Sequence, residues 1–483
     1  MQADTKNVVE RVSQIIESQK EKFTAISDQI WEFAEVRFEE NESSECLASF
    51  MEEQDFHIER GVAGIPTAFT ATSGTSGPVI AILGEFDALP GLSQKAGKTS
   101  KEPIQSEAPG HGCGHNLLGV GGIAAAVAVR TYMEEQGLEG TIRYYGCPAE
   151  ESGYGKTYMV KAGLFEDVDA AFSWHPHYMN RLFNGPTLAV VHAHFTFKGV
   201  SSHAAASPEL GRSALDAVEL MNVGVNYMRE HMPDDARVHY AITNTGGMSP
   251  NVVQPEAEVA YFVRAPQSAQ AKELFERVKN IAKGASLMTE TTVEHRIEGA
   301  CSNLVSNRVL DQLLHQNMAA LEEAHFTEEE LRTSKAFYET LSDNEKQMAA
   351  SLVGEQQAAE LSERPLIHEV APYSEPKASS KGTGSTDVGD VSWVTPTTQL
   401  MAATEAFGTP LHTWQVVAQG QTSYAKKGML YAGKSLASTI INALQTPDVL
   451  REAKEELHRQ GAGADQYDCL LPEEQVLPHM LHQ

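Results

Sequence analysis

The chain has 483 residues, of which 41% are hydrophobic and 21% charged. At roughly 100–200 residues per domain, this length predicts about two to four domains with buried cores. Its 65 acidic residues outnumber its 37 basic residues, so the formal net charge is −28. Because clusters of Lys and Arg bind nucleic acids and anionic membrane surfaces, this charge argues against both as partners.

The sequence predicts neither export nor membrane insertion. The amino-terminal residues lack the basic and then apolar pattern of a secretory signal. The longest small-and-apolar run, 117–129, is shorter than the roughly 20 residues that cross a bilayer. The five cysteines are odd in number and widely spaced, which does not describe a disulfide framework. We therefore expect a cytoplasmic protein with reduced thiols.

Helices and strands alternate in the first part of the chain. The first 36 residues and those after Asn41 have helical spacing, and an Ala- and Val-rich helix follows Asn116. This alternation predicts an α/β domain, in which polar residues that follow strands gather at one edge of the sheet. The predicted strands are 67–72, 79–83, 141–145 and 170–174.

The pattern changes between about residues 188 and 299. Here the order strand, helix, strand, strand, helix, strand predicts a ferredoxin-like α+β module. The α/β pattern then resumes, so the sequence predicts an α/β domain of residues 1–187 and 300–483, interrupted by an inserted module of residues 188–299. The elements predicted in the module are 190–197, 211–230, 237–244, 256–264, 268–287 and 291–297.

The last third carries fewer signals. Residues 325–365 are charged and helical in pattern, and a strand is expected at 398–403. A helix follows over about 423–445. We expect the polar tail after Arg451 to be loosely ordered.

Several side chains suited to metal binding follow predicted strands or glycine-rich loops. Thiolate, imidazole and carboxylate are the ligand types that zinc and other first-row divalent ions prefer. The set is larger than one tetrahedral ion needs, and two ions sharing a ligand would use it. The side chains are Cys113, His115, Glu150, Glu151, His175 and His412.

The adjacent carboxylates suit two different roles. If Glu151 ligates a metal, Glu150 remains near the metal-activated water as a general base. In an extended segment, successive side chains point in different directions, which two roles require. Taken singly, a Cys-x-His pair is more often structural, and a Glu-Glu pair more often lies on a solvated surface. Only the complete set favours a metal site.

Two other motif matches do not fit their structural context. The segment 119–124 matches the dinucleotide-binding pattern G-x-G-x-x-A, but it lies inside a predicted helix rather than between a strand and a helix. Gly155-Lys156-Thr157 is similar to the end of a phosphate-binding loop, but Glu150 occupies the position of the required earlier glycine. We reject both interpretations.

The chain resembles the aminoacylase/carboxypeptidase family of two-metal amidohydrolases, and within it the branch of the indole-acetyl-amino-acid hydrolases. Further matching segments extend the resemblance over nearly the whole length. The motifs that carry it are Gly84-Glu85-Phe86-Asp87-Ala88-Leu89-Pro90, Gly112-Cys113-Gly114-His115-Asn116, Glu150-Glu151 and Gly408-Thr409-Pro410-Leu411-His412.

The resemblance implies roles for individual residues. It makes Glu150 the catalytic acid/base and His203 of the inserted module an oxyanion-stabilising residue, often supplied by a partner subunit. Asn251 and Arg264 would bind a substrate carboxylate, for which a guanidinium is well shaped. The ligands of two divalent ions, manganese or zinc, would be Cys113, His115, Glu151, His175 and His412, with His177 as the alternative to His175.

Two positions depart from the family pattern. Many members have His-x-Asp after the first strand, whereas this chain has Glu85-Phe86-Asp87. We expect Cys113 and His115 to supply the missing coordination, with Asp87 supporting a ligand by a hydrogen bond. Asn116 stands where relatives often have Asp.

The resemblance implies a metal-dependent amidohydrolase that cleaves an amide between an aryl or acyl group and an amino acid, glutamate being favoured. Its substrate would be a small molecule with a carboxylate. The inserted module would act as a lid and form a homodimer, or a hetero-oligomer with a related A-type subunit. The alternatives are an aminoacylase or dipeptidase of another acyl preference, and a non-catalytic subunit of a two-chain hydrolase.

Overall fold

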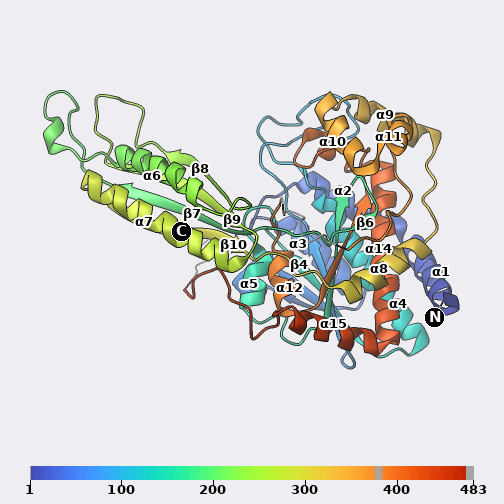
Figure 1. The fold of residues 1–483 in the computed structure, drawn as a ribbon. Helices are drawn as coiled ribbons and strands as arrows, with labels where there is room; N and C mark the ends of the chain where they lie inside the picture. Colours follow the sequence, from blue (N-terminus) through green and yellow to red (C-terminus); the bar gives the residue numbers. More distant parts are fainter. Residues whose placement is uncertain (1, 376–381, 383, 475–483) are drawn as a thin grey trace. The chain divides into compact units, whose positions relative to one another are not determined.

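The computed structural model describes residues 2–375, 382 and 384–474, which form two compact units (Figure 1). Unit 1 comprises the described parts of residues 1–184, 305–376 and 391–466. Unit 2 comprises those of residues 185–304, 377–390 and 467–483. Helix α12 (Val388–Val394) includes residue 390, after which unit 2 ends and unit 1 resumes along the chain.

A seven-stranded sheet in the order β1-β2-β4-β3-β5-β11-β6 forms the centre of unit 1. Its inner strands pair in parallel, and their almost continuous apolar side chains are buried, as expected for a sheet covered on both faces. The inner strands are β3 (Val79–Glu85), β4 (Thr141–Cys147), β5 (Ala170–His177) and β11 (Thr397–Ala403), and the antiparallel outer ones are β1 (His57–Arg60), β2 (Phe69–Ser73) and β6 (Arg181–Leu182).

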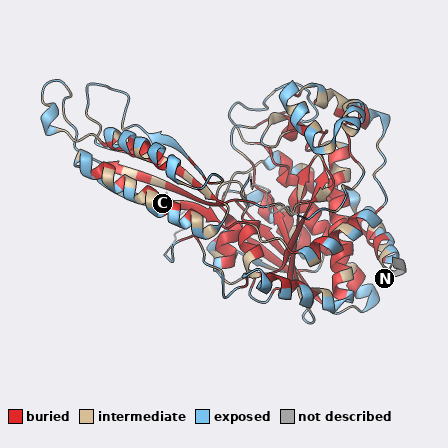
Figure 2. Ribbon diagram, viewed as in Figure 1, coloured by how far each residue is buried: buried red, intermediate tan, exposed pale blue. Residues whose placement is uncertain are grey.

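Two long helices cover much of this sheet. Helix α4 packs on β3, β4 and β5, while α14 packs on β5, β11 and α4. Buried residues concentrate along the strands and the inward helix faces, and exposed residues lie on the outer helices (Figure 2). The helices of unit 1 are α1 (Gln2–Ser18), α2 (Lys20–Phe33), α3 (Asn41–Glu53), α4 (His115–Gln136), α5 (Gly155–Lys161), α8 (Arg308–Ala320), α9 (Glu328–Glu339), α10 (Asp343–Val353), α11 (Glu355–Glu363), α13 (Trp414–Gln419), α14 (Ser423–Gln445) and α15 (Pro447–Arg459).

The glycines of α4 serve packing, which explains the dinucleotide-like pattern. A Cβ atom on Gly121 would lie 2.7 Å from Nε1 of Trp174 on β5. Glycine at this position therefore lets the helix approach the sheet closely. Helix α4 has the length and hydropathy of a membrane span, but 89% of its apolar window is buried in the protein.

The tail after Arg451 is helical as far as Arg459, contrary to our expectation, and its residues 475–483 lie outside the described residues. Helix α15 begins after Thr446 with Pro447 in its first turn, a position where the missing N–H costs nothing. Leu450, Ala453 and Leu457 recur at helical spacing and are buried. The many charged residues between them obscured this narrow apolar stripe in the sequence.

Unit 2 has the predicted ferredoxin-like topology. Its antiparallel sheet has the order β10-β7-β9-β8, with helices α6 and α7 packed on the sheet. The α/β fold class with an inserted α+β module is thereby confirmed. The elements are β7 (Ala189–Lys198), α6 (Ala214–Met228), β8 (Arg237–Asn244), β9 (Glu256–Ala265), α7 (Ser268–Thr289) and β10 (Thr292–Cys301).

Candidate metal centre

The predicted ligands meet at the carboxyl edge of the parallel strands in unit 1. Cys113 lies in the loop before α4, and His115 is the first residue of that helix. Glu151 follows β4, and His175 lies near the end of β5. His412 lies in the loop after β11, where its backbone N–H donates to the Gly112 carbonyl at 2.7 Å. The α/β topology thus gathers residues from four chain segments.

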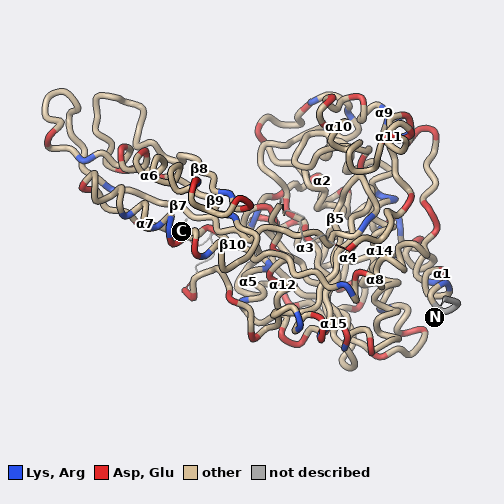
Figure 3. Tube along the Cα trace, in the orientation of Figure 1, with Lys and Arg blue, Asp and Glu red and all other residues tan. Residues whose placement is uncertain are grey.

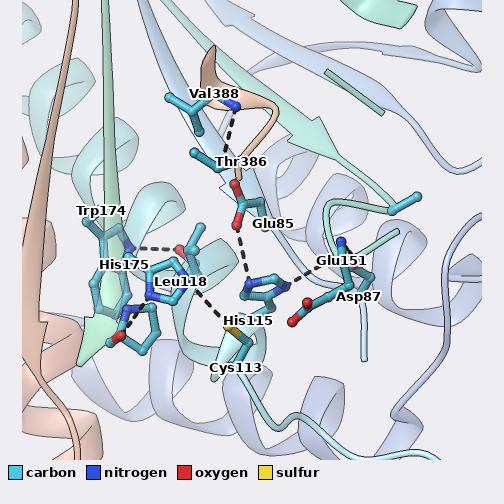
Figure 4. A network of polar contacts seen from close by, with 12 residues as sticks. Glu85, Asp87, Cys113, His115, Leu118, Glu151, Trp174, His175, Thr386 and Val388 are labelled. Atoms are coloured by element: carbon cyan, nitrogen blue, oxygen red, sulfur yellow. Dashed lines mark hydrogen bonds and ion pairs between the residues drawn. The ribbon is translucent and has the colours of Figure 1, made fainter. Parts of the chain in front are cut away.

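The potential ligand atoms form two groups of three that share Cys113. In each group the atoms lie within 4.8 Å of one another. The first group contains the thiol with His115 and His175, and the Cys113 Sγ atom lies 3.4 Å from His175 Nε2 (Figure 4). The second contains the thiol with Glu151 and His412, whose Nε2 lies 3.2 Å from Glu151 Oε2. A bridging position for the thiolate fits this arrangement.

Asp87 connects a ligand of each group. Its Oδ1 lies 2.9 Å from His115 Nδ1, and its Oδ2 accepts the Glu151 backbone N–H at 2.9 Å. Burial lowers the pKa of His115, but the contact with Asp87 and the charges of Glu85 and Glu151 together outweigh this, and the pKa rises to about 10. Such a carboxylate–histidine contact fixes the ring and directs Nε2 toward a metal.

The unmet polar groups fit divalent ions. Among the described residues, His115 Nε2 and Glu151 Oε1 are buried without a hydrogen bond. Burial and the charges of Glu151 and Glu150 raise the pKa of the Cys113 thiol well above its usual value. A dication would supply the missing partner and stabilise the thiolate. The donor set of sulfur, imidazole and carboxylate therefore suits the predicted metals.

The close approach of two ligand-bearing segments depends on Gly114. This residue has φ +74°, and a Cβ atom on it would lie 2.8 Å from the Pro176 Cβ atom. Glycine is favoured by both the backbone conformation and the contact. It allows the Cys113 loop to lie directly against the end of β5 that carries His175.

His175 and His177 occupy different environments. His175 faces Cys113, and its Nδ1 lies 2.7 Å from the Pro176 carbonyl oxygen. His177 belongs to neither ligand group and stacks on Tyr178, with ring centroids 4.1 Å apart. Burial and the charge of Arg181 lower the pKa of His177 to about 3. The geometry thus favours His175 as the ligand.

Glu150 belongs to a third group, with Glu85 and His115. It therefore lies beside the predicted ligands, while Glu151 faces Cys113 and His412; the separate roles of the two glutamates stay predictions. Asn116 points elsewhere: its Nδ2 donates to Ser27 Oγ at 3.2 Å. Its amide therefore supports helix packing.

Sequence reasoning missed the partner of Glu85. Lys156 is fully buried, and its Nζ atom lies 2.7 Å from Glu85 Oε1. Glu85 Oε2 lies 3.4 Å from His115 Nε2. Lys156 belongs to the motif rejected as a phosphate-binding loop. Lys156 is the one charged residue of the segment 152–160, which was the available signal, because a lysine in an otherwise uncharged segment is usually paired when it is buried.

The three remaining predicted residues lie in unit 2. His203 pairs by a bridge with Val252, and the Ala204 N–H donates to the Asn251 carbonyl at 3.0 Å. His203 and Asn251 are therefore neighbours. Arg264 lies near the carboxyl end of β9, and its Cζ atom lies 5.2 Å from the centroid of the Phe262 ring. The catalytic and binding roles of all three stay predictions.

A sheet edge bearing two ligand groups and a further carboxylate defines the class of the protein, a metal-dependent amidohydrolase or peptidase. Residues 81–344 match the model of the peptidase family M20/M25/M40. The chain is also 47% identical to the B-type subunit of p-aminobenzoyl-glutamate hydrolase from Escherichia coli K12, over 95% of this chain and 97% of the relative. It therefore belongs to the peptidase family M20/M25/M40.

Solved structures share the fold. An aminobenzoyl-glutamate utilization protein from Klebsiella pneumoniae has a TM-score of 0.61 and 18% identity, covering 90% of this chain and 99% of its own. A dinuclear metal-binding peptidase of the M20 family from Bacillus subtilis has a TM-score of 0.53 and 18% identity, covering 89% and 99%. At these identities the likeness concerns the fold alone.

Proposed function

We propose that the chain hydrolyses p-aminobenzoyl-glutamate to p-aminobenzoate and glutamate with two divalent ions. The observation that carries the two-metal part is the pair of ligand groups sharing Cys113. The 47% identity to one of the subunits of a p-aminobenzoyl-glutamate hydrolase supports the choice of substrate. The cysteines of the described residues form no disulfide with one another, which fits the proposed cytoplasmic location.

The ligands would be His115 and His175 for one ion, Glu151 and His412 for the other, and Cys113 for both. When bound, these ions supply Lewis-acid activation of a water and of the amide carbonyl. Thiolate and imidazole favour zinc by their softness, whereas the family resemblance implies manganese. Metal analysis of the chain as purified decides between them.

Glu150 would move the proton during cleavage. Its carboxylate accepts a proton from the attacking water and then delivers it to the leaving amine. His115 and Glu85 lie within reach of it, so the carboxylate sits among fixed buried groups rather than in bulk solvent. Because these groups are already in place, the proton transfer requires little reorganisation of solvent in the transition state.

His203 is arranged as a hydrogen-bond donor. Its Nδ1 accepts the backbone N–H groups of Ala205 at 3.2 Å and of Ala206 at 3.1 Å. In the neutral ring the proton therefore resides on Nε2. This N–H is suited to stabilise the oxyanion that forms when the amide carbonyl is attacked.

Two chains would be needed to bring all the residues of unit 2 to one substrate. The loop that carries His203 begins beside the start of β9, where the carbonyl of Pro255, the residue before the strand, accepts the Gly199 N–H. Arg264 is eight residues along the strand from Glu256, or about 26 Å. A substrate of about three extended units spans only about 11 Å. A homodimer, or a hetero-oligomer with a related subunit, would supply His203 and Arg264 from different chains.

Unit 2 offers an edge for such pairing. Strand β8 lies at the end of its sheet, so one side of its backbone lacks a neighbouring strand in the described chain. Apolar side chains on β8 and on the adjoining α6 are exposed, which is typical of an interface. They are Leu220 (37%), Val223 (50%), Tyr227 (76%), Tyr240 (38%) and Ile242 (41%).

The acidic surface is compatible with an acidic substrate. Asp and Glu residues are spread over helices and loops of both units (Figure 3). Net charge describes the solvent-facing shell, whereas a substrate carboxylate would meet the local positive charge of Arg264, and the two dications would be positive charges at their own site. The charge therefore counts against nucleic acid and not against a small dicarboxylate.

The test is hydrolysis by the purified chain alone. We expect the chain with two bound ions to release p-aminobenzoate from p-aminobenzoyl-glutamate. We expect it to hydrolyse N-acetyl amino acids and dipeptides more slowly. A preference for these would identify an aminoacylase or dipeptidase. Bound metal without any turnover until a related subunit is added would identify a non-catalytic or dependent subunit. No bound metal and no turnover would refute the proposal.

A further inference from the structure

We propose that Glu40 is a positioning residue that fixes the turn carrying Glu150. The inference rests on the proposed function, in which Glu150 is the acid/base. Glu40 precedes α3, and its side chain is fully buried. Its Oε1 accepts the backbone N–H of Ala149 at 2.9 Å, and its Oε2 accepts the hydroxyl of Thr67 at 3.0 Å.

The turn after β4 requires such an anchor because its backbone is unusual. Ala149 has φ +59°, a left-handed conformation that is unfavourable for a residue with a Cβ atom. Its carbonyl accepts the N–H groups of Gly153 at 2.9 Å and Tyr154 at 2.6 Å. The Ala149 peptide groups are thus held on both sides, and the two glutamates lie in the short segment that they enclose.

A second buried carboxylate holds the other side of Glu150. The N–H of Glu151 donates to Asp87 Oδ2 at 2.9 Å. The peptide N–H groups immediately before and after Glu150 are therefore bound by Glu40 and Asp87. With both neighbours fixed, the Cα position of Glu150 is set by the protein rather than by a metal or a substrate.

Burying the carboxyl group of Glu40 costs free energy, which favours a functional explanation for this residue. Burial and the nearby charge of Asp87 raise the pKa of Glu40 to about 8. Packing alone would be served by an apolar side chain without this desolvation. The carboxyl group is retained where its oxygen can accept the Ala149 N–H.

The test compares variants that separate the two contacts of Glu40. Glu40→Met and Glu40→Asp remove or misplace the acceptor for Ala149. Glu40→Gln keeps an oxygen for that N–H and can donate to the Thr67 hydroxyl. Thr67→Val is the matched control, because it removes only the other hydrogen bond of the same carboxyl group.

We expect kcat for p-aminobenzoyl-glutamate to fall about 100-fold in Glu40→Met and Glu40→Asp, since a misplacement of 1 Å costs this much. KM and metal content should stay near those of the original chain. Glu40→Gln should restore most of kcat, and Thr67→Val should lower Tm while kcat stays within about threefold. If Glu40→Met does not fold, Glu40→Asp makes the same comparison.

Unchanged kcat in either Glu40→Met or Glu40→Asp would overturn the inference. An equal loss of kcat in Thr67→Val would also overturn it, because the loss of activity would then follow from lower stability rather than from the contact with Ala149. Glu150→Gln, assayed in parallel, separates this failure from that of the proposed function. An active Glu150→Gln would refute the acid/base role, whereas an inactive one beside an active Glu40→Met would refute only the positioning role.

Discussion

The double contact of Asp87 predicts a measurable loss of metal affinity in Asp87→Asn. The carboxylate serves His115 through one oxygen and the Glu151 N–H through the other. Asparagine has nearly the same shape but only one oxygen, so its NH2 group must face one of the two donors. One charge-assisted hydrogen bond is lost, worth about 1.5–3 kcal/mol.

This energy corresponds to about 10- to 150-fold weaker metal binding. The range agrees with the usual effect of removing a group that orients a metal ligand. Metal-free protein would be titrated with Zn²⁺ or Mn²⁺ against a chromophoric chelator at fixed pH. We expect the site whose ligand loses its hydrogen bond to weaken by this factor, and the other site to weaken less, because its ligand keeps a hydrogen bond to the uncharged amide.

Asp311→Asn provides the matched control. Asp311 is also buried in unit 1, and its Oδ1 accepts the hydroxyl of Thr398 at 2.6 Å. It belongs to neither ligand group, so its replacement should leave metal affinity unchanged. If Asp87→Asn binds metal within threefold of the original chain, the reasoning about the shared carboxylate is wrong.

Four further outcomes follow from the same contacts. Glu150→Gln should bind metal normally while kcat falls about 10²- to 10⁴-fold, measured by p-aminobenzoate release. Cys113→Ser should weaken the binding of both ions in metal titrations, because a serine hydroxyl stays protonated. Burial raises the pKa of Glu405 to about 8, so the native state loses stability relative to the unfolded chain as pH rises from about 4.5 to 8. Glu405→Gln should therefore gain in Tm over the original chain across that window, and a constant difference would contradict this. Ile242→Lys on β8 should halve the mass of a homodimer in analytical ultracentrifugation.

The sheet edge could be predicted because local signals agreed. The run Val79–Leu83 is apolar throughout, and polar residues follow it at once, as they follow β4 and β5. Parallel strands place their carboxyl ends at one edge, so sequence position was enough to bring Cys113, Glu151 and His175 together. The order of elements in unit 2 likewise determined its topology.

Contacts that join distant segments could not be predicted. Nothing in the sequence near Glu40 indicates that its carboxyl group reaches Ala149, which lies 109 residues away. The pairing of Lys156 with Glu85 depends in the same way on how α5 meets β3. Sharing of Cys113 between two ligand groups is also a property of the tertiary fold, because ligand number alone leaves the bridging residue open.

The buried thiol has a consequence for how the chain acquires its ions. A thiol binds a metal as the thiolate, and an imidazole binds it through a nitrogen that carries no proton. Burial and the neighbouring carboxylates raise the pKa of the Cys113 thiol, so its proton must leave when the ions bind. Metal binding to the centre therefore releases protons, and the apparent affinity for the ions should fall as the pH falls.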